Sequence, residues 1–218
     1  MSAFPGQPRL LRGGIVLVDI DTAQVQRVVT LQYNPDTLTR TLQVQGATGD
    51  TPDHLEALRL KGPPIETIKL DAELDATDQL EFPDQNPNAV TYGLHPQLAA
   101  LETVVYPTAQ QTLETYQQAQ AGAMEVLPLA APLQLFVWSA RRVLPVRITD
   151  FSVTEEQFST QLNPTRAKVS LSMRVLNVND IGFDNKGGSL FMIHMQQKEQ
   201  LAKLAAGALA TLGLRGLP

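Results

Sequence analysis

The stretch "ETIKLDAELDATD", Glu66 to Asp78, decides the fold. Its apolar residues fall at every second position, and polar residues occupy the positions between them. Successive side chains of a β-strand point to opposite faces, so this alternation predicts a strand with one packed face and one wet face. The packed face would hold Ile68, Leu70, Ala72, Leu74 and Ala76, and the wet face Thr67, Lys69, Asp71, Glu73 and Asp75.

The carboxylates of the wet face are candidates for chemistry. Same-face residues of one strand lie roughly 7 Å apart, a spacing compatible with an acid and base pair or with part of a hard-cation site. Side chains of a single strand stand parallel, however, whereas metal ligands must converge on a point. We therefore interpret Lys69, Asp71, Glu73 and Asp75 as a channel-wall or surface face, with a carboxylate-based hydrolase as the alternative. Asp75 and Asp78 are also typical of turns closed by bonds to their own backbone.

Other segments predict further strands. Two apolar, branched runs separated by a polar turn, residues 14–20 and 27–33, indicate a hairpin. Residues 37–46 alternate, with Leu38, Leu42 and Val44 on the packed side and Arg40 as the exception there. Three later strands are expected over Pro132–Ser139, Leu144–Ser159 and Arg166–Leu176.

Helices are expected in two places. Between Pro96 and Met124 the alternation gives way to good helix formers, and Pro107 predicts a break near Tyr106. From Ser189, a plausible cap, the apolar residues follow a helical period. They are Leu190, Ile193, Leu201, Leu204, Ala208 and Leu212. Together these elements predict a mainly β fold of the α+β class.

Composition narrows the function. The 218 residues include 17 Lys and Arg against 22 Asp and Glu, a net charge of −5, which argues against a nucleic-acid partner. The chain has no cysteine, so disulfides and thiolate chemistry are excluded. We find no secretory signal and no run of eighteen apolar residues, so synthesis in the cytoplasm and no membrane span are expected.

Signals for catalysis or cofactor binding are weak. His54, His95 and His194 have no partner histidine at metal-ligand spacing, and Ser139 lacks the G-x-S-x-G elbow. "GFDNKGGS", residues 182–189, lacks the Lys-Ser or Lys-Thr that a phosphate loop requires, and a connector explains it better. We therefore expect no catalytic residue, no metal and no cofactor.

Aromatic and basic residues gather around "LFVWSARR". Phe136 and Trp138 share a strand face, and Arg141 and Arg142 follow them. A large aromatic pair is typical of a core, but aromatics beside arginine are also enriched at the centres of interfaces. Both alternatives stay open for these four candidate interface residues.

Four segments in this order resemble the tube and tube-initiator proteins of contractile injection systems, which are phage-tail-like particles. They are "LQYNPDTLTRTLQ" (residues 31–43), "GPPIETIKLDAELDATD" (62–78), "PLQLFVWSARRVLPVRITDFSVTEEQFS" (132–159) and "NPTRAKVSLSMRVL" (163–176). The resemblance rests on the combination of an aromatic-Asn-Pro, a strand ending in "DATD", and "FVW" before a basic strand.

The resemblance implies an Hcp-like tube β-barrel that forms a ring, a hexamer, in which the subunits build a continuous inner sheet around a lumen. It implies a baseplate hub adaptor whose partners are the spike and inner-tube proteins of the same particle. The expected domains are a tube-type barrel over residues 1–180, with a helical insertion near 96–124, and a connector with a C-terminal helix over 181–218. Many similar hub proteins carry a peptidoglycan-binding module after the barrel, and none is found here.

Overall fold

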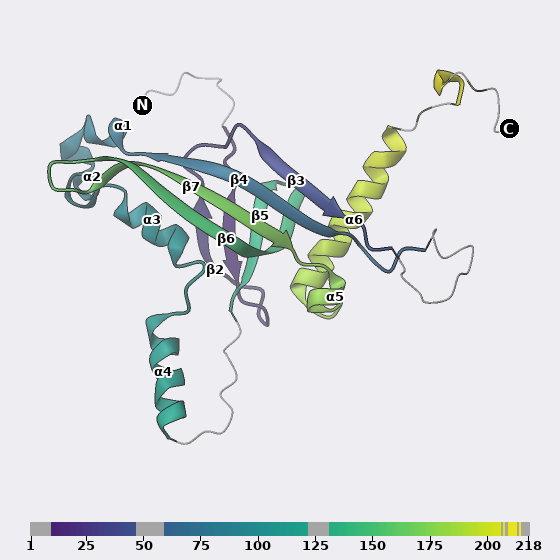
Figure 1. Cartoon of the computed structure of the whole chain (residues 1–218), viewed down its shortest axis with the longest axis horizontal. Helices are drawn as coiled ribbons and strands as arrows, with labels where there is room; N and C mark the ends of the chain where they lie inside the picture. The colour runs from purple at the N-terminus through teal and green to yellow at the C-terminus, as the bar shows by residue number, and fades with distance from the viewer. Residues whose placement is uncertain are drawn as a thin grey trace.

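A computed structural model describes residues 10–46, 59–121, 131–205, 207, 209–212 and 214 (Figure 1). Its strands are β1 (Gly14–Val18), β2 (Val25–Thr30), β3 (Leu38–Gln43), β4 (Ile65–Asp75), β5 (Leu133–Ser139), β6 (Arg142–Phe158) and β7 (Pro164–Val175). Its helices are α1 (Thr77–Leu80), α2 (Pro87–Tyr92), α3 (His95–Glu102), α4 (Ala109–Gln120), α5 (Val178–Ile181) and α6 (Lys186–Leu204), with short 3-10 turns η2 (Pro83–Gln85) and η3 (Leu209–Leu212).

The strands form one seven-stranded sheet in the order β2-β1-β5-β6-β7-β4-β3. Every neighbouring pair is antiparallel, including the predicted hairpin of β1 and β2. The fold is therefore mixed α and β around a large antiparallel sheet. A barrel requires its first and last strands to exchange backbone hydrogen bonds. Within the described residues β2 and β3 pair with no further strand, so the expectation of a barrel closed within one chain is wrong.

Strand β4 has the alternation that its sequence predicts. Ile68, Leu70, Ala72 and Leu74 are all buried, and they lie beside the equally alternating β7. Opposite Leu70, for example, is Leu171, so apolar side chains meet across the strands on one face. On the other side of β7, the register with the 17-residue β6 shifts at three places, which is how a long strand bends and twists. We call the side of the sheet that carries these buried residues the core face, and the opposite side of β4, β7 and β6 the polar face.

The helices cover the core face at its two ends (Figure 1). At one end α1, η2, α2 and α3 follow β4, and Leu94, Leu98 and Leu101 are buried in the same core as β4. At the other end α6 lies against β6 and adds Phe191 to that core. On β1 and β5 both sides carry apolar residues, and a second, smaller core of Val18, Leu133 and Leu135 forms there.

The predicted pair of helices in the middle of the chain is confirmed as α3 and α4, with Pro107 in the break between them. The sequence does not predict α1 and α2, because Asp75 and Asp78 are typical of a turn and the prolines and asparagines of residues 82–96 are typical of loops. In the structure Pro87 and Pro96 stand in the first turns of α2 and α3. Proline is favourable there because the first N–H groups of a helix have no intrahelical partner.

Strand β3 is packed less than its alternation predicts. Leu38 contacts the core, but Leu42 is 48% exposed and Val44 is 69% exposed. The prediction that Leu42 and Val44 are packed is wrong because β3 is an edge strand, and the core ends before its last residues are covered.

Helix α6 begins earlier than predicted. Its cap is Asn185, whose side chain accepts a hydrogen bond from the backbone N–H of Gly188 at 2.9 Å. The side of α6 that is buried includes Phe191 and His194. Four residues of the predicted stripe are exposed, Ile193, Leu201, Leu204 and Leu212, and the last of them lies beyond the end of α6. The predicted stripe is wrong at Ile193 because α6 buries the face that carries Phe191 and His194. It is wrong at Leu201 and Leu204 because the last turns of α6 extend past the sheet (Figure 1). Ala208 lies outside the residues whose side chains are described.

Candidate functional site

The polar face carries the four residues that the sequence singled out on β4. Lys69, Asp71 and Glu73 are exposed and Asp75 is half-buried. Each is opposite a polar or basic residue of β7, in the pairs Lys69–Ser172, Asp71–Ser170, Glu73–Lys168 and Asp75–Arg166. The polar face is therefore built from the polar residues of two neighbouring strands, β4 and β7, rather than from a single row on β4.

Contacts across the strands occupy the carboxylates. The Ser170 hydroxyl donates a hydrogen bond to Oδ1 of Asp71 at 2.6 Å. The guanidinium of Arg166 lies 3.9 Å from Glu73 and 4.0 Å from Asp75. On the β6 side, Glu156 lies 3.0 Å from Lys168 and 3.7 Å from Arg166. Acidic and basic side chains thus alternate and offset one another over this face.

Asp75 has a structural task at the end of β4. Its Oδ1 accepts a hydrogen bond from the backbone N–H of Thr77 at 2.8 Å, as predicted for a turn-closing aspartate. Hydrogen bonding from Thr77 holds the pKa of Asp75 below its ordinary value, and the positive charge of Arg166 adds to this. The Asp75 backbone is held in turn by Gln32, whose amide donates to its carbonyl at 2.6 Å and accepts from its N–H at 2.9 Å. This contact joins the segment after β2 to the end of β4.

The polar face does not converge on a reaction centre. Its carboxylate side chains stand parallel to one another. Their oxygens accept a hydrogen bond from a neighbouring serine or form ion pairs with neighbouring arginine and lysine residues. Within the described ranges, no group of three or more His, Cys, Asp or Glu is positioned to hold a metal ion. Of the histidines considered for a catalytic role, His95 is exposed at the start of α3 and His194 is buried in α6. His54 lies outside the described residues.

The candidate interface residues separate into two kinds. Phe136 is 1% exposed and belongs to the core, so it offers no surface to a partner, and the core alternative holds for it. Trp138 is half-buried, stacks on Phe136 with ring centroids 5.9 Å apart, and covers Gly13, where an added Cβ would lie 2.7 Å from the indole. Arg141 is exposed and Arg142 is half-buried at the turn between β5 and β6. Only the outer part of this group remains available for contact.

A buried charged cluster on the core face was not predicted. Glu66, at the start of β4, is 4% exposed. Its Oε1 accepts a hydrogen bond from Nε of Arg40 of β3 at 2.7 Å and forms an ion pair with Nη2 of the same side chain at 2.6 Å. Its Oε2 accepts a hydrogen bond from Nζ of Lys198 of α6 at 3.1 Å. Burial raises the pKa of Glu66, but these two cations more than offset it, so the pKa lies below its ordinary value. One carboxylate thus ties two strands to the C-terminal helix.

His194 lies in the same region of α6. It is 7% exposed, and neither ring nitrogen has a hydrogen-bond partner among the described residues. Burial lowers the pKa of His194, and the nearby charge of Lys198 lowers it further, although Glu66 acts in the opposite direction. The sequence signal for this cluster was present but unused. Glu66 has the same parity as Ile68 and Leu70, and Arg40 was the exception on the packed side of β3.

Comparison of the chain with models of known protein families finds no match, and comparison with curated proteins finds none either. Among the described residues, no helix combines the length and apolar character needed to cross a lipid bilayer.

Proposed function

We propose that this protein is a structural component of a contractile injection particle, which assembles into a ring in the baseplate hub and joins the spike to the inner tube. The observation that carries the proposal is the open sheet, whose two edge strands, β2 and β3, are both unpaired on their outer sides within the described residues. The type of particle and the position of the ring in its baseplate hub are inferred from the resemblance to tube and tube-initiator proteins.

Two open edges on one chain favour assembly. An unpaired edge exposes backbone N–H and C=O groups and is a template for pairing with another chain. Both edges also carry exposed apolar side chains, Val25 and Val28 on β2 and Leu42 on β3. Because the edges differ in sequence, the contact between copies would be head-to-tail, and such a contact closes into a ring when the rotation between copies allows it.

The polar face fits the wall of such a ring. Its charges are matched by neighbours on the same sheet, and a wall in contact with water needs no converging site. By contrast, the hydrolase alternative requires a carboxylate pair with free oxygens and a place for substrate, and the contacts of Asp71, Glu73 and Asp75 give it little support.

The test is whether the edges are required for assembly. The purified chain, alone and mixed with spike and inner-tube proteins, would be examined by mass measurement and electron microscopy for six-fold rings. Val28→Lys and Leu42→Lys each place a charge on an edge strand and should prevent ring formation. Thr154→Lys is the matched control because it puts the same charge on an exposed position of the central strand β6. A chain that stays monomeric with its partners present, or edge variants that assemble as well as the control, would overturn the proposal.

A further inference from the structure

Helix α4 stands apart from the body of the protein (Figure 1). It has 12 residues and none of them is buried. Its side-chain hydrogen bonds are local: a capping box joins Thr108 and Gln111, Gln110 donates to Glu114, and Gln120 donates to Tyr116. An isolated helix of about this length is marginally stable in water, because most helical stability in proteins comes from packing of one face. Within the part of the chain that the structure describes, the helix therefore lacks a packing partner that would stabilise it.

One side of α4 is suited to such packing. Leu113 and Tyr116 are three residues apart, so they share a face, and they are 55% and 59% exposed. Just before the helix, Val105 and Tyr106 are 41% and 67% exposed. Four large apolar side chains within twelve residues of an exposed segment form a patch that we call the arm patch. Exposed apolar residues gathered in this way are typical of interaction sites.

Helix α4, which we call the arm, follows α3 beside one open edge of the sheet. Nη1 of Arg27 on β2 donates a hydrogen bond to the hydroxyl of Thr103 at 2.7 Å, at the end of α3. Only five residues separate Thr103 from the first residue of α4. Any chain that paired with the outer side of β2 would therefore lie next to the arm.

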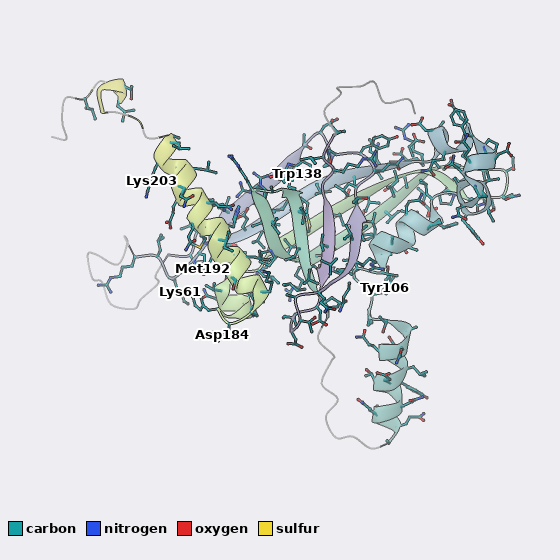
Figure 2. All side chains as sticks on the ribbon, turned by 180° about the vertical axis from the view of Figure 1, so that it is seen from behind. Lys61, Tyr106, Trp138, Asp184, Met192 and Lys203 are labelled. Atoms are coloured by element: carbon teal, nitrogen blue, oxygen red, sulfur yellow. The ribbon has the colours of Figure 1, made fainter. Side chains whose placement is uncertain are left out.

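The opposite edge of the same molecule carries a complementary surface. Leu42 and Val44 are exposed there, and Leu60, opposite Gly46, is 70% exposed. Lys61 and Lys69 are exposed on the same edge region. Figure 2 shows Lys61 on one side of the sheet and Tyr106, at the base of the arm, on the other.

Charge contributes little to this match. Helix α4 has one charged residue, Glu114, whereas Lys69 on the β3 side shares the exposed face of β4 with Asp71 and Glu73. The exposed apolar side chains are therefore what make the two sides suited to one another.

We propose that α4 is an arm that packs its apolar patch over the β3 edge of a second copy of this chain. The proposal rests on the proposed ring function and adds one contact to it. The neighbouring copy that pairs with β2 also packs against α4. A 12-residue helix is about 18 Å long, and strands lie about 4.8 Å apart, so the arm can span about three to four strands of the neighbour. It can therefore reach Leu42 and Val44 from the adjoining edge.

Cross-linking tests this contact directly, because the chain has no cysteine of its own. Leu113→Cys in an untagged copy would be mixed with Leu42→Cys in a tagged copy under assembly conditions and treated with a short bismaleimide. The expected result is a cross-linked heterodimer. The matched control replaces Leu113→Cys by Gln118→Cys, which lies on the opposite side of α4 and should give several-fold less product.

A second measurement follows assembly itself. Leu113→Gln with Tyr116→Gln keeps good helix formers in α4 but removes the apolar patch, and should weaken self-association by about tenfold or more, as judged by sedimentation. Gln118→Ala should not change it. If wild-type rings form but show neither the preferred cross-link nor the weakening, the arm contact is wrong and the ring proposal stands. If no assembly occurs even with spike and tube proteins present, both proposals are wrong.

Discussion

Arg40 and Glu66 join strands β3 and β4 on the core face of the sheet, with two guanidinium nitrogens 2.6 and 2.7 Å from a single carboxylate oxygen. The second oxygen of Glu66 takes Lys198 from α6 at 3.1 Å. Because Glu66 is 4% exposed, its charge is stabilised by these partners rather than by water. An edge strand and the last long helix are thereby fixed to β4 by one side chain.

Substitution Glu66→Gln should lower the free energy of unfolding by about 2 kcal/mol. The loss is smaller than the ~3–5 kcal/mol of a fully buried pair because both cations keep part of their surface in water. Urea unfolding at pH 7 measures it. Lys69→Gln, which removes an exposed charge from the same strand, is the control and should change the free energy of unfolding by less than about 0.5 kcal/mol. Equal effects of the two substitutions would contradict the role given to Glu66.

His194 should make the protein less stable in mild acid. Burial in the folded state lowers the pKa of His194 below the ordinary value of 6.5, which the unfolded chain keeps. Below about that pH the unfolded state binds more protons, so the free energy of unfolding falls as the pH drops. Glu66 does not produce this loss near pH 6, because its own pKa lies below its ordinary value and its stabilisation is lost only at lower pH.

The measurement is the urea midpoint from pH 7.5 to 5. His194→Leu should flatten this dependence, since it removes a group that is protonated more readily in the unfolded state than in the folded state. His95→Leu is a matched control at an exposed site and should keep the wild-type slope. A His194 variant with an unchanged slope would show that another group is responsible.

The sequence predicts the strands of this fold well because alternation is a local signal. One face of β4 and β7 is buried along nearly the whole length of each strand. The polarity of each residue therefore indicates which face its side chain lies on. A second local signal, the tendency of aspartate to bond the backbone of a turn, correctly predicts the role of Asp75. Alternation fails at β3, where Leu42 and Val44 follow the pattern but lie on an edge beyond the core.

What the sequence could not supply is contact between distant segments. The sheet would close into a barrel only if the edge strands β2 and β3 paired with each other. The spacing of apolar residues within a strand does not indicate which strands pair. The pairing of Glu66 with Lys198 spans 132 positions, so each looked like an ordinary charged residue. Helix α2 is not predicted because a proline that starts a helix and a proline that ends one look alike in the sequence. Helix α1 is not predicted because Asp78, in its first turn, is equally typical of a loop.

Gly93→Ala should destabilise the protein by about 3 kcal/mol. Gly93 has φ +57° and ψ −130°, a region that residues with a Cβ rarely adopt. An added Cβ would also lie 2.4 Å from the carbonyl oxygen of Pro164, which accepts a hydrogen bond from Leu94 at 2.8 Å. Thermal unfolding would measure the effect. Gly182→Ala separates the two causes, because Gly182 has φ +74° but open space around its Cβ position. It should cost about 1 kcal/mol, and a cost equal to that at Gly93 would contradict the close approach to Pro164.

The polar face should tolerate loss of its carboxylates. Asp71→Ser with Glu73→Ser removes one hydrogen bond to Ser170 and one long ion pair to Arg166, both at the surface. Exposed pairs contribute about 0–1 kcal/mol each, and Arg166 keeps Asp75 and Glu156, so the free energy of unfolding should change by less than about 1 kcal/mol. Leu74→Ser is the contrasting control, because Leu74 is 3% exposed on the other face of the same strand and its loss should cost about 3 kcal/mol or more. Chemical unfolding gives both values, and electron microscopy of the assembled particle gives the second readout. If the polar face only lines a ring, the double variant should keep both its stability and its assembly into particles. If the protein is a hydrolase that depends on Asp71 and Glu73, the variant should keep its stability but lose turnover of its substrate.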